Sequence, residues 1–412
     1  MFKQACFSFI AALWLAMPAS AGALQEPAAP LTLAQAQRLA REGSPTLSAA
    51  RREVEATEGQ VLQGSLRPNP EFVFQADDTS RLSRTSSAQL DVPVETANKR
   101  EARVEAAERS RDVAQTDFAD RGQRLRAAVS AAFFDVLAAQ ELLRAAQEGL
   151  NLARRATDVA SRRVTAGKVS PVEETKARVA EAGARVALTQ AESGLRNART
   201  RLSSLWGNPL PQFTLAEGSI DRLPDLPDGI AIEQRLQDAP ALLRAERELR
   251  RRKALVGVEQ SRTVPNFTVS VGMKRREDTV GRDQLLVGVS VPLQMFNRNQ
   301  GNLLEALRRE DKARDELQAV RTSVAADAYQ ALEKANARRH EVELLQRDVL
   351  PGARSAYEAA TIGFENGKFS FLELLDAQRT LFTATAQYLA AIAAVHAALA
   401  ELDGILGTVD SL

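Results

Sequence analysis

The sequence predicts a mainly α-helical fold with a small β part, built from one unit that occurs twice. The first observation is an alternating strand at 284–293 that runs through Pro292 into a helical pattern of about sixty residues. The second is a matching junction 199 residues earlier, where Pro93 closes a similar strand ahead of another very long helical stretch. The third is composition: aromatic residues make up only 5% and alanine is abundant, as in long, closely packed helices. We therefore expect a duplicated unit of long coiled-coil helices, with two β-hairpins per chain.

Length and charge narrow the class of protein further. A chain of 412 residues would ordinarily form about two or three domains, but the internal repeat reduces this to two copies of one unit. Charged residues make up 26% and the formal net charge is +1. The sequence therefore lacks the excess of basic residues that would point to nucleic acid as a partner.

Residues 1–21 predict a secretory signal peptide. Lys3 supplies the positive charge, 5–17 the apolar stretch and Ala19-Ser20-Ala21 the cleavage site. A first membrane helix is the alternative, but the apolar run is shorter than the ~20 residues that span a bilayer. The single cysteine, Cys6, lies inside the signal and not at its end, so we expect neither a lipid anchor nor a disulfide. No later segment has an uninterrupted apolar run of about eighteen residues, which leaves a periplasmic, an extracellular or an outer-membrane β-barrel protein.

The first repeat spans residues 22–206. Thr32 has the residue type of an N-cap for its opening helix, which Gly43-Ser44-Pro45 interrupts before the helical pattern resumes. A hairpin and two long helices follow. These elements are strands at about 72–78 and 86–94, and helices at about 99–165 and 172–205.

The second repeat spans residues 230–412 and follows an inter-repeat linker at 207–229, which contains four prolines. Pro351 lies within its long ascending helix, where a proline should kink the helix. The expected elements are strands at about 267–274 and 284–293, and long helices at about 302–365 and 371–406.

The expected strands fit a membrane barrel. Each is about nine residues long, the length of a tilted transmembrane strand, and alternates an apolar face with a small or polar one, as when lipid lies outside and a lumen inside. A soluble hairpin packed on the helices would show the same alternation. The signal peptide and the charged loops at the hairpin tips favour the membrane. Since spanning barrels begin at about eight strands, four strands cannot close, and the chain must assemble; three copies would supply twelve.

The mature chain as a whole resembles the TolC family of outer-membrane efflux channels. The resemblance rests on the signal peptide, the two repeats, one hairpin in each repeat and paired helices of ~100 Å. Two segments, Leu66–Glu71 and Pro292–Gly301, resemble the branch that serves heavy-metal efflux, the cobalt–zinc–cadmium type. The first repeat departs from that branch, which commonly has glycines where this chain has Thr96-Ala97-Asn98.

The resemblance implies an assembly and its partners. It implies a homotrimer, with a twelve-stranded β-barrel in outer-membrane lipid and an α-barrel of twelve helices that reaches through the periplasm. A periplasmic adaptor (a membrane fusion protein) and an inner-membrane pump of the resistance–nodulation–division (RND) type complete a tripartite system, in which this protein is the passive exit duct. Heavy-metal cations are the cargo we expect. The alternatives are a duct for organic drugs or solvents, a duct for type I protein secretion, and a periplasmic coiled-coil scaffold without a pore.

Two Gly-Lys-x-Ser turns mark where the long helices reverse. Glycine permits the positive φ of a tight reversal and serine can cap the next helix, so structure alone accounts for these types. A phosphate-binding loop is excluded, because neither Gly-Lys pair has the required preceding glycine or strand. The resemblance implies that the turns also contact the adaptor, although an exposed lysine needs no function. The residues are Gly167, Lys168, Ser170, Gly367, Lys368 and Ser370.

Glu373 and Asp376 are the expected periplasmic gate. They lie three residues apart on the last long helix and therefore share a face, and they match positions where TolC-like channels place acidic residues at the aperture. Three chains would bring six carboxylates to the axis, where a ring attracts cations and repels itself. The alternative is ordinary negative charge at a helix N-terminus. That alternative suffices for Glu173 and Glu174 in the first repeat, where Lys176 replaces the equivalent of Asp376.

No pattern predicts a metal site, a cofactor site or an enzyme. The only histidines, His340 and His396, stand alone on helices, and His340-Glu341 lacks the second histidine of a zinc protease motif. The mature chain offers no thiol ligand, and we find no nucleophile motif or catalytic triad. We therefore expect metals to pass through an acidic duct instead of resting at a coordination site.

Overall fold

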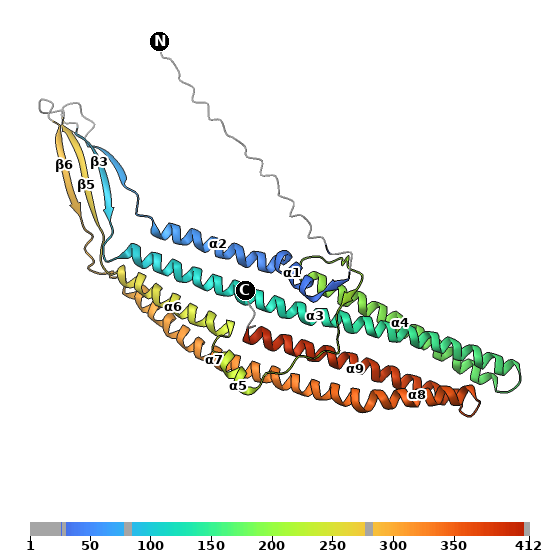
Figure 1. The fold of residues 1–412 in the computed structure, drawn as a ribbon. Helices are drawn as coiled ribbons and strands as arrows, with labels where there is room; N and C mark the ends of the chain where they lie inside the picture. The colour runs from blue at the N-terminus through green and yellow to red at the C-terminus, as the bar shows by residue number, and fades with distance from the viewer. Residues whose placement is uncertain (1–25, 27–29, 78–84, 277–282, 408–412) are drawn as a thin grey trace, which may run out of the picture.

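The computed structural model describes residues 26, 30–77, 85–276 and 283–407. The expected signal peptide lies outside these residues. The molecule is elongated, with a sheet at one end and two helical turns at the other (Figure 1). The elements of the first repeat are β1 (Leu31–Thr32), α1 (Leu33–Gly43), α2 (Pro45–Ser65), β2 (Glu71–Asp77), β3 (Thr85–Val94), α3 (Lys99–Thr165) and α4 (Pro171–Ser204).

The second repeat follows the same plan after a short strand, β4 (Ala216–Glu217). Its strand β6 ends at Ser290, three residues before the expected end at 293. Pro292 lacks the N–H that a further ladder hydrogen bond would need. The elements are α5 (Gly229–Leu236), α6 (Pro240–Ser261), β5 (Phe267–Arg276), β6 (Gln284–Ser290), α7 (Gln300–Leu344), the π-helical η1 (Leu345–Val349), α8 (Leu350–Glu365) and α9 (Phe371–Leu406).

Strands and helices follow the same lateral order. The antiparallel sheet has the order β2-β3-β5-β6. Next to the sheet, the helices that lead into or out of these strands pack in the order α2-α3-α6-α7. Toward the helical turns the order becomes α4-α3-α9, followed by α7 and α8. One chain is therefore a wall four elements wide, and its first and last elements each have an open side.

α3 links the two ends of the wall as a single helix of 67 residues, about 100 Å at 1.5 Å per residue. No proline interrupts it, and pairs such as Arg121–Asp117 and Arg162–Asp158 join residues one turn apart. Exposed pairs of this kind contribute about 0.3–0.5 kcal/mol each. Packing of a buried face of small side chains contributes more, because Ala153, Ala156 and Ala160 let neighbouring helices approach closely.

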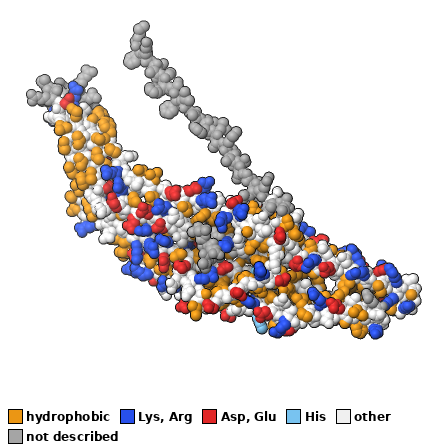
Figure 2. Space-filling view, in the orientation of Figure 1, with side chains coloured by type: hydrophobic (Ala, Val, Ile, Leu, Met, Phe, Trp, Pro, Cys, Tyr) orange, Lys and Arg blue, Asp and Glu red, His pale blue; other side chains and the backbone are white. Residues whose placement is uncertain are grey.

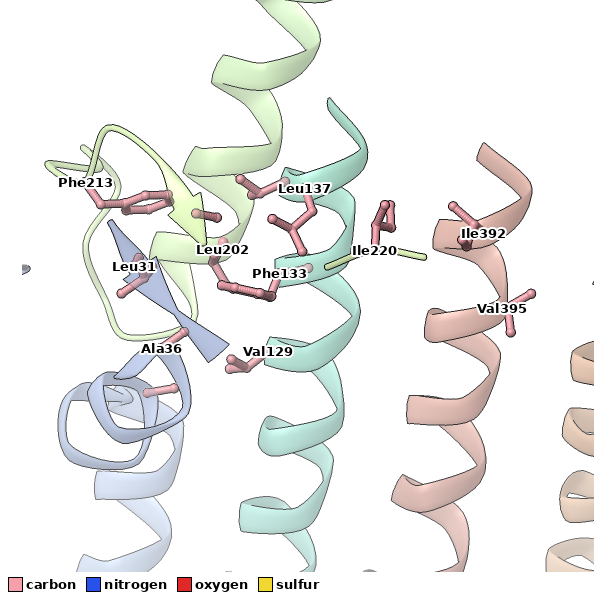
Figure 3. Close-up of a cluster of buried hydrophobic side chains, with 14 of the residues drawn as sticks. Leu31, Ala36, Val129, Phe133, Leu137, Leu202, Phe213, Ile220, Ile392 and Val395 are labelled. Atoms are coloured by element: carbon pink, nitrogen blue, oxygen red, sulfur yellow. The ribbon is translucent and has the colours of Figure 1, made fainter. Parts of the chain in front are cut away.

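The inter-repeat linker is built into the wall. We call residues 206–227 the strap. Its Trp206, Phe213 and Ile220 are buried in the cluster that also holds Phe133 of α3 and Val395 of α9. Figure 3 shows Ile220 between α3 and α9, and Figure 1 shows the strap crossing the helices on its way to α5. Within the strap, β4 pairs in parallel with β1, which fastens the start of the chain to it.

Glu26 also fastens the start of the chain to the strap. Its carboxylate is buried and accepts hydrogen bonds from Trp206 Nε1 (2.8 Å), Asn208 Nδ2 (2.5 Å), and the backbone N–H groups of Gln212 (2.5 Å) and Phe213 (3.1 Å). Burial disfavours the charged form, but these donors outweigh it, and the pKa of Glu26 lies below its ordinary value.

We predict that Glu26→Gln loses about 1–3 kcal/mol of stability at neutral pH, because the new amide turns an N–H toward other donors. A lowered native pKa contributes stability that is complete above the ordinary value of 4.5 and is lost as the pH falls through the native pKa. The difference in unfolding midpoint between wild type and variant should therefore shrink below about pH 4.5. Glu217→Gln, at an exposed site on the same strap, is the control and should unfold like wild type at every pH.

The backbone at the junction between β3 and α3 has a conformation that favours glycine, although the sequence has none there. Ala97 and Asn98 have φ values of +53° and +52°, and Asn299 in the second repeat has +62°. The left-handed conformation is ordinary for glycine and tolerated by asparagine, but costs an alanine about 1–2 kcal/mol. The backbone thus keeps a conformation that suits glycine where the sequence has none.

We predict that Ala97→Gly raises the thermal unfolding midpoint of the protein in detergent, with a gain of about 1 kcal/mol. Ala119→Gly is the matched control, because Ala119 is exposed within α3 and a glycine there should cost about 1 kcal/mol. Equal effects of the two substitutions would contradict the strain at Ala97.

The long helix of the second repeat is disturbed just before Pro351. The backbone N–H of Leu350 bonds to the carbonyl of Leu345, five residues back, so η1 is a π-helical turn between α7 and α8. Proline cannot donate the hydrogen bond that an α-helix would require at position 351, and its ring crowds the preceding turn.

One described helix, α9, has the length and composition of a membrane span. Over half of its most apolar window, 56%, is buried inside the protein, chiefly against α3 and α7. Its apolar character is therefore that of a core helix.

Candidate channel wall and periplasmic tips

The sheet has one continuous apolar face. The register aligns large apolar side chains across all four strands, and most of them are exposed; Leu285 exposes 76% of its surface. Figure 2 shows this face as a hydrophobic band over the sheet. A soluble hairpin packed on the helices would bury it, so that alternative is wrong, and lipid is the natural contact. Two of the rows are Phe72-Leu90-Val271-Val287 and Phe74-Ala88-Met273-Leu285.

The opposite face of the sheet is small and polar. This is the composition expected of strands that face a water-filled lumen. Among its glycines, Gly272 is tightly constrained, because β3 passes very close to it: a Cβ there would lie 2.4 Å from the Ala88 carbonyl oxygen. Rows on this face include Gln75-Ser87-Lys274-Gln284 and Glu71-Asp91-Ser270-Gly288.

The two Gly-Lys-x-Ser turns have the predicted geometry. Gly167 and Gly367 adopt φ values of +69° and +72°. Ser170 caps α4 through the N–H of Val172 (3.4 Å) and Ser370 caps α9 through the N–H of Glu373 (3.4 Å). Lys168 and Lys368 are exposed at the far end of the molecule. The turns are therefore built for chain reversal, and their lysines are free to meet a partner.

Glu373 and Asp376 lie on the same exposed side of α9 but in different surroundings. The Glu373 carboxylate accepts from the backbone N–H of Ser370 at 2.7 Å and from its hydroxyl at 3.0 Å, which completes a capping box. Asp376 makes no hydrogen bond or ion pair with another described residue. In the first repeat, Glu174 is instead paired with Arg178 at 2.6 Å. One of the two expected gate residues thus has a structural task as well.

A contact between the two tips was not foreseen from the sequence. Arg163 of α3 donates to the carbonyl of Phe364 at 2.6 Å, and its guanidinium lies 4.6 Å from the Phe364 ring. Phe364 also packs edge-on against Phe371. Arg163 is the counterpart, at the repeat spacing of 200, of Gly363. This difference between the two repeats was the signal in the sequence that could have indicated the contact.

One histidine is buried in the core and the other is exposed on a helix. His396 is buried, stacks on Phe134 with ring centres 3.5 Å apart, and bonds the Ile220 carbonyl at 3.0 Å. Burial lowers its pKa, so it stays neutral near pH 7. His340 is exposed and lies 4.0 Å from Glu343. Within the described residues no group of three or more His, Cys, Asp or Glu side chains is placed to hold a metal ion.

Comparison with known proteins extends these observations to nearly the whole chain. The family described as "Outer membrane efflux protein" matches residues 36–208 and 231–408, one segment per repeat. The cobalt-zinc-cadmium resistance protein CzcC of Cupriavidus metallidurans is 45% identical over 93% of this chain and 91% of its own length. The nickel and cobalt resistance protein CnrC of the same organism is 28% identical over 77% and 78% of the two chains.

A solved structure of CusC shares the fold. It superposes with a TM-score of 0.77 at 18% identity, and covers 91% of this chain and 92% of that one. The resemblance to TolC-like outer-membrane efflux channels and to their heavy-metal branch is confirmed, and the relatives are channel proteins, not enzymes. The chain belongs to the outer membrane efflux protein family.

Proposed function

We propose that this chain is the outer-membrane channel of a tripartite efflux system for heavy-metal cations. The observation that carries the proposal is the sheet with one lipid-facing side, joined end to end to a wall of ~100 Å helices in the same lateral order. The cargo rests on CzcC, which is named for cobalt, zinc and cadmium resistance. The channel lies in the outer membrane and extends into the periplasm.

The open sides of the wall support a homotrimer. β2 and β6 each have one unpaired edge within the described sheet, and an unpaired edge in lipid leaves backbone groups without partners. On α4, the outermost helix, Val172, Val179 and Val186 recur every seven residues and expose 57–67% of their surfaces. This spacing is typical of a coiled-coil seam, so the exposed face can pack against another helix. Three copies close twelve strands, a number within the range of spanning barrels.

The tips support contact with a periplasmic adaptor, which connects the duct to an inner-membrane RND pump. Gly167, Lys168 and Ser170 of one turn and Gly367, Lys368 and Ser370 of the other form exposed reversals at the end far from the membrane. Glu373 and Asp376, a few residues along α9 from the second turn, form the gate. In the trimer their carboxylates attract cations and repel one another.

Growth of a deletion strain tests the function. The strain is challenged with cobalt, zinc, cadmium, nickel, copper and silver ions and with several organic antibiotics. Selective metal sensitivity that the gene restores would support the proposal. Sensitivity only to organic compounds would keep the duct and replace its cargo, and a normal profile for a protein that forms no heat-modifiable oligomer would favour a scaffold.

A further inference from the structure

The strap is tied to the helices in the order in which they form the wall. Four helices of the wall, α4, α3, α9 and α7, each contribute at least one side chain that contacts the backbone of the strap. The contacts are Arg199 of α4 to the carbonyl of Phe213, the Gln140 amide of α3 to both backbone groups of Ala216, His396 of α9 to the carbonyl of Ile220, and Arg339 of α7 to the carbonyl of Pro224.

These contacts weaken toward α7. Gln140 makes two hydrogen bonds to Ala216, of 2.7 and 3.0 Å. On α9, Tyr388 adds a bond of 2.8 Å to Asp221 beside the buried His396 contact. Arg339 is 3.4 Å from its carbonyl and 4.0 Å from Asp225, at a partly exposed site. The strap therefore holds α4, α3 and α9 firmly and α7 loosely.

The π-helical turn η1 begins just beyond the last of these contacts. η1 starts at Leu345, six residues after Arg339, and Pro351 follows it. A π-helical turn holds one residue more than an α-helix would over the same rise, and it commonly marks a functional segment. The equivalent stretch of α3, residues 145–151, is regular α-helix without proline. Only the second repeat has a built-in point of bending here.

A groove lies beside α8, the helix that follows η1. This groove of about 1780 Å³ runs between α3, α8 and α9, with the strap at its edge. Leu350, Arg354 and Tyr357 of α8 line it. Beyond the groove, α8 meets the first repeat again through Arg163 and Phe364. Between η1 and Tyr357 one side of α8 faces the groove, and from Tyr357 onward α8 packs in a hydrophobic cluster with Ala156 and Ala160 of α3.

We propose that η1 is the hinge on which the second tip moves, while the strap holds the rest of the wall still. α8 has 16 residues, about 24 Å, so a bend of about 10° at η1 displaces the tip by about 4 Å. That displacement is enough to break the Arg163–Phe364 contact and to carry Glu373 and Asp376 away from the axis. The hinge rests on the proposed channel function for its purpose, but its motion can be measured separately.

The test removes one residue from the π-helical turn. Gln346 is exposed, and its deletion lets regular α-helical pairing continue while the tip keeps its orientation. Gln346→Ala is the matched control, because it keeps the length. Lys168→Cys and Lys368→Cys, labelled with nitroxide in the purified protein, report the distance between the tips of the two repeats by pulsed electron resonance. We expect a broad distribution in wild type and control, and a narrower one in the deletion. Channel openings in planar bilayers should fall about tenfold.

Pro351→Ala is the second variant, since it restores the missing N–H without changing the length. It should slow amide exchange at residues 346–350 and narrow the distance distribution, as the deletion does. Unchanged distributions in both variants would overturn the hinge. Absence of channels in wild type and Gln346→Ala alike would overturn the proposed function instead, and the distance measurement would still decide the hinge.

Discussion

A Gly272→Ala variant is expected to lose most of its assembled β-barrel. A Cβ at this position would lie 2.4 Å from the carbonyl oxygen of Ala88 and 2.6 Å from the Cβ of Gln89, the residue directly opposite on β3. The first of these atoms belongs to the backbone, so the two hairpins of the protomer would have to separate. Overpacking of this kind costs about 1–3 kcal/mol, and a trimer repeats the cost in every copy.

The measurement is the amount of heat-modifiable oligomer in detergent, which should fall about tenfold or more for a cost of about 1.4 kcal/mol or more. Gly288→Ala is the control in the same sheet and on the same face. A Cβ at Gly288 would meet only the Ser270 side chain, at an ordinary 3.6 Å. Equal yields of the two variants would show that β3 and β5 do not approach as closely as described here.

Glu373→Gln combined with Asp376→Asn is expected to raise the conductance of a closed resting channel or to reduce its cation selectivity. Removal of six carboxylates from the proposed trimer removes the negative charge that attracts and holds cations in the narrow aperture, so the ions that obstruct a closed channel are released and the preference for cations falls. The substitutions preserve the tip, since glutamine at position 373 can complete the capping box as the glutamate does. Asp376→Asn alone isolates a carboxylate that has no partner among the described residues.

Recordings in planar bilayers with asymmetric salt report conductance and selectivity together. Glu173→Gln with Glu174→Gln is the control, because both residues lie in the first turn of α4, where Glu173 is the counterpart of Glu373 and Glu174 is already paired with Arg178. If the pair at 373 and 376 leaves both quantities at wild-type values, those residues are helix-terminal charges and not a gate.

Local patterns in the sequence predicted much of the fold. The alternation on β5 and β6, the proline at each strand end and the glycine at each turn are short-range signals. They act on the backbone within a few residues. The same is true of Pro351, where a missing N–H predicts a disturbed helix whatever surrounds it. The family resemblance then predicted an assembly of several chains, which these local signals do not specify.

The packing of the strap could not be predicted from local patterns in the sequence. Its prolines indicate a connection, and only the packing reveals that Phe213 and Ile220 are buried and that Gln140 and His396 hold the backbone of the strap. None of these partners lies within seventy residues of the strap residue that it contacts. No periodicity reports a contact of that kind.

The sequence by itself determined the duplicated unit, the apolar and polar faces of each strand, the positions of the two turns and the weak point before Pro351. Backbone preference and side-chain period decide these within a few residues. Only the tertiary structure decided the lateral order of the helices, the fastening of the strap, the contact of Arg163 with Phe364 and the capping task of Glu373. The first three depend on which distant surfaces pack together, and the last on how the chain turns at Ser370, so each is settled by geometry that residue types alone do not specify.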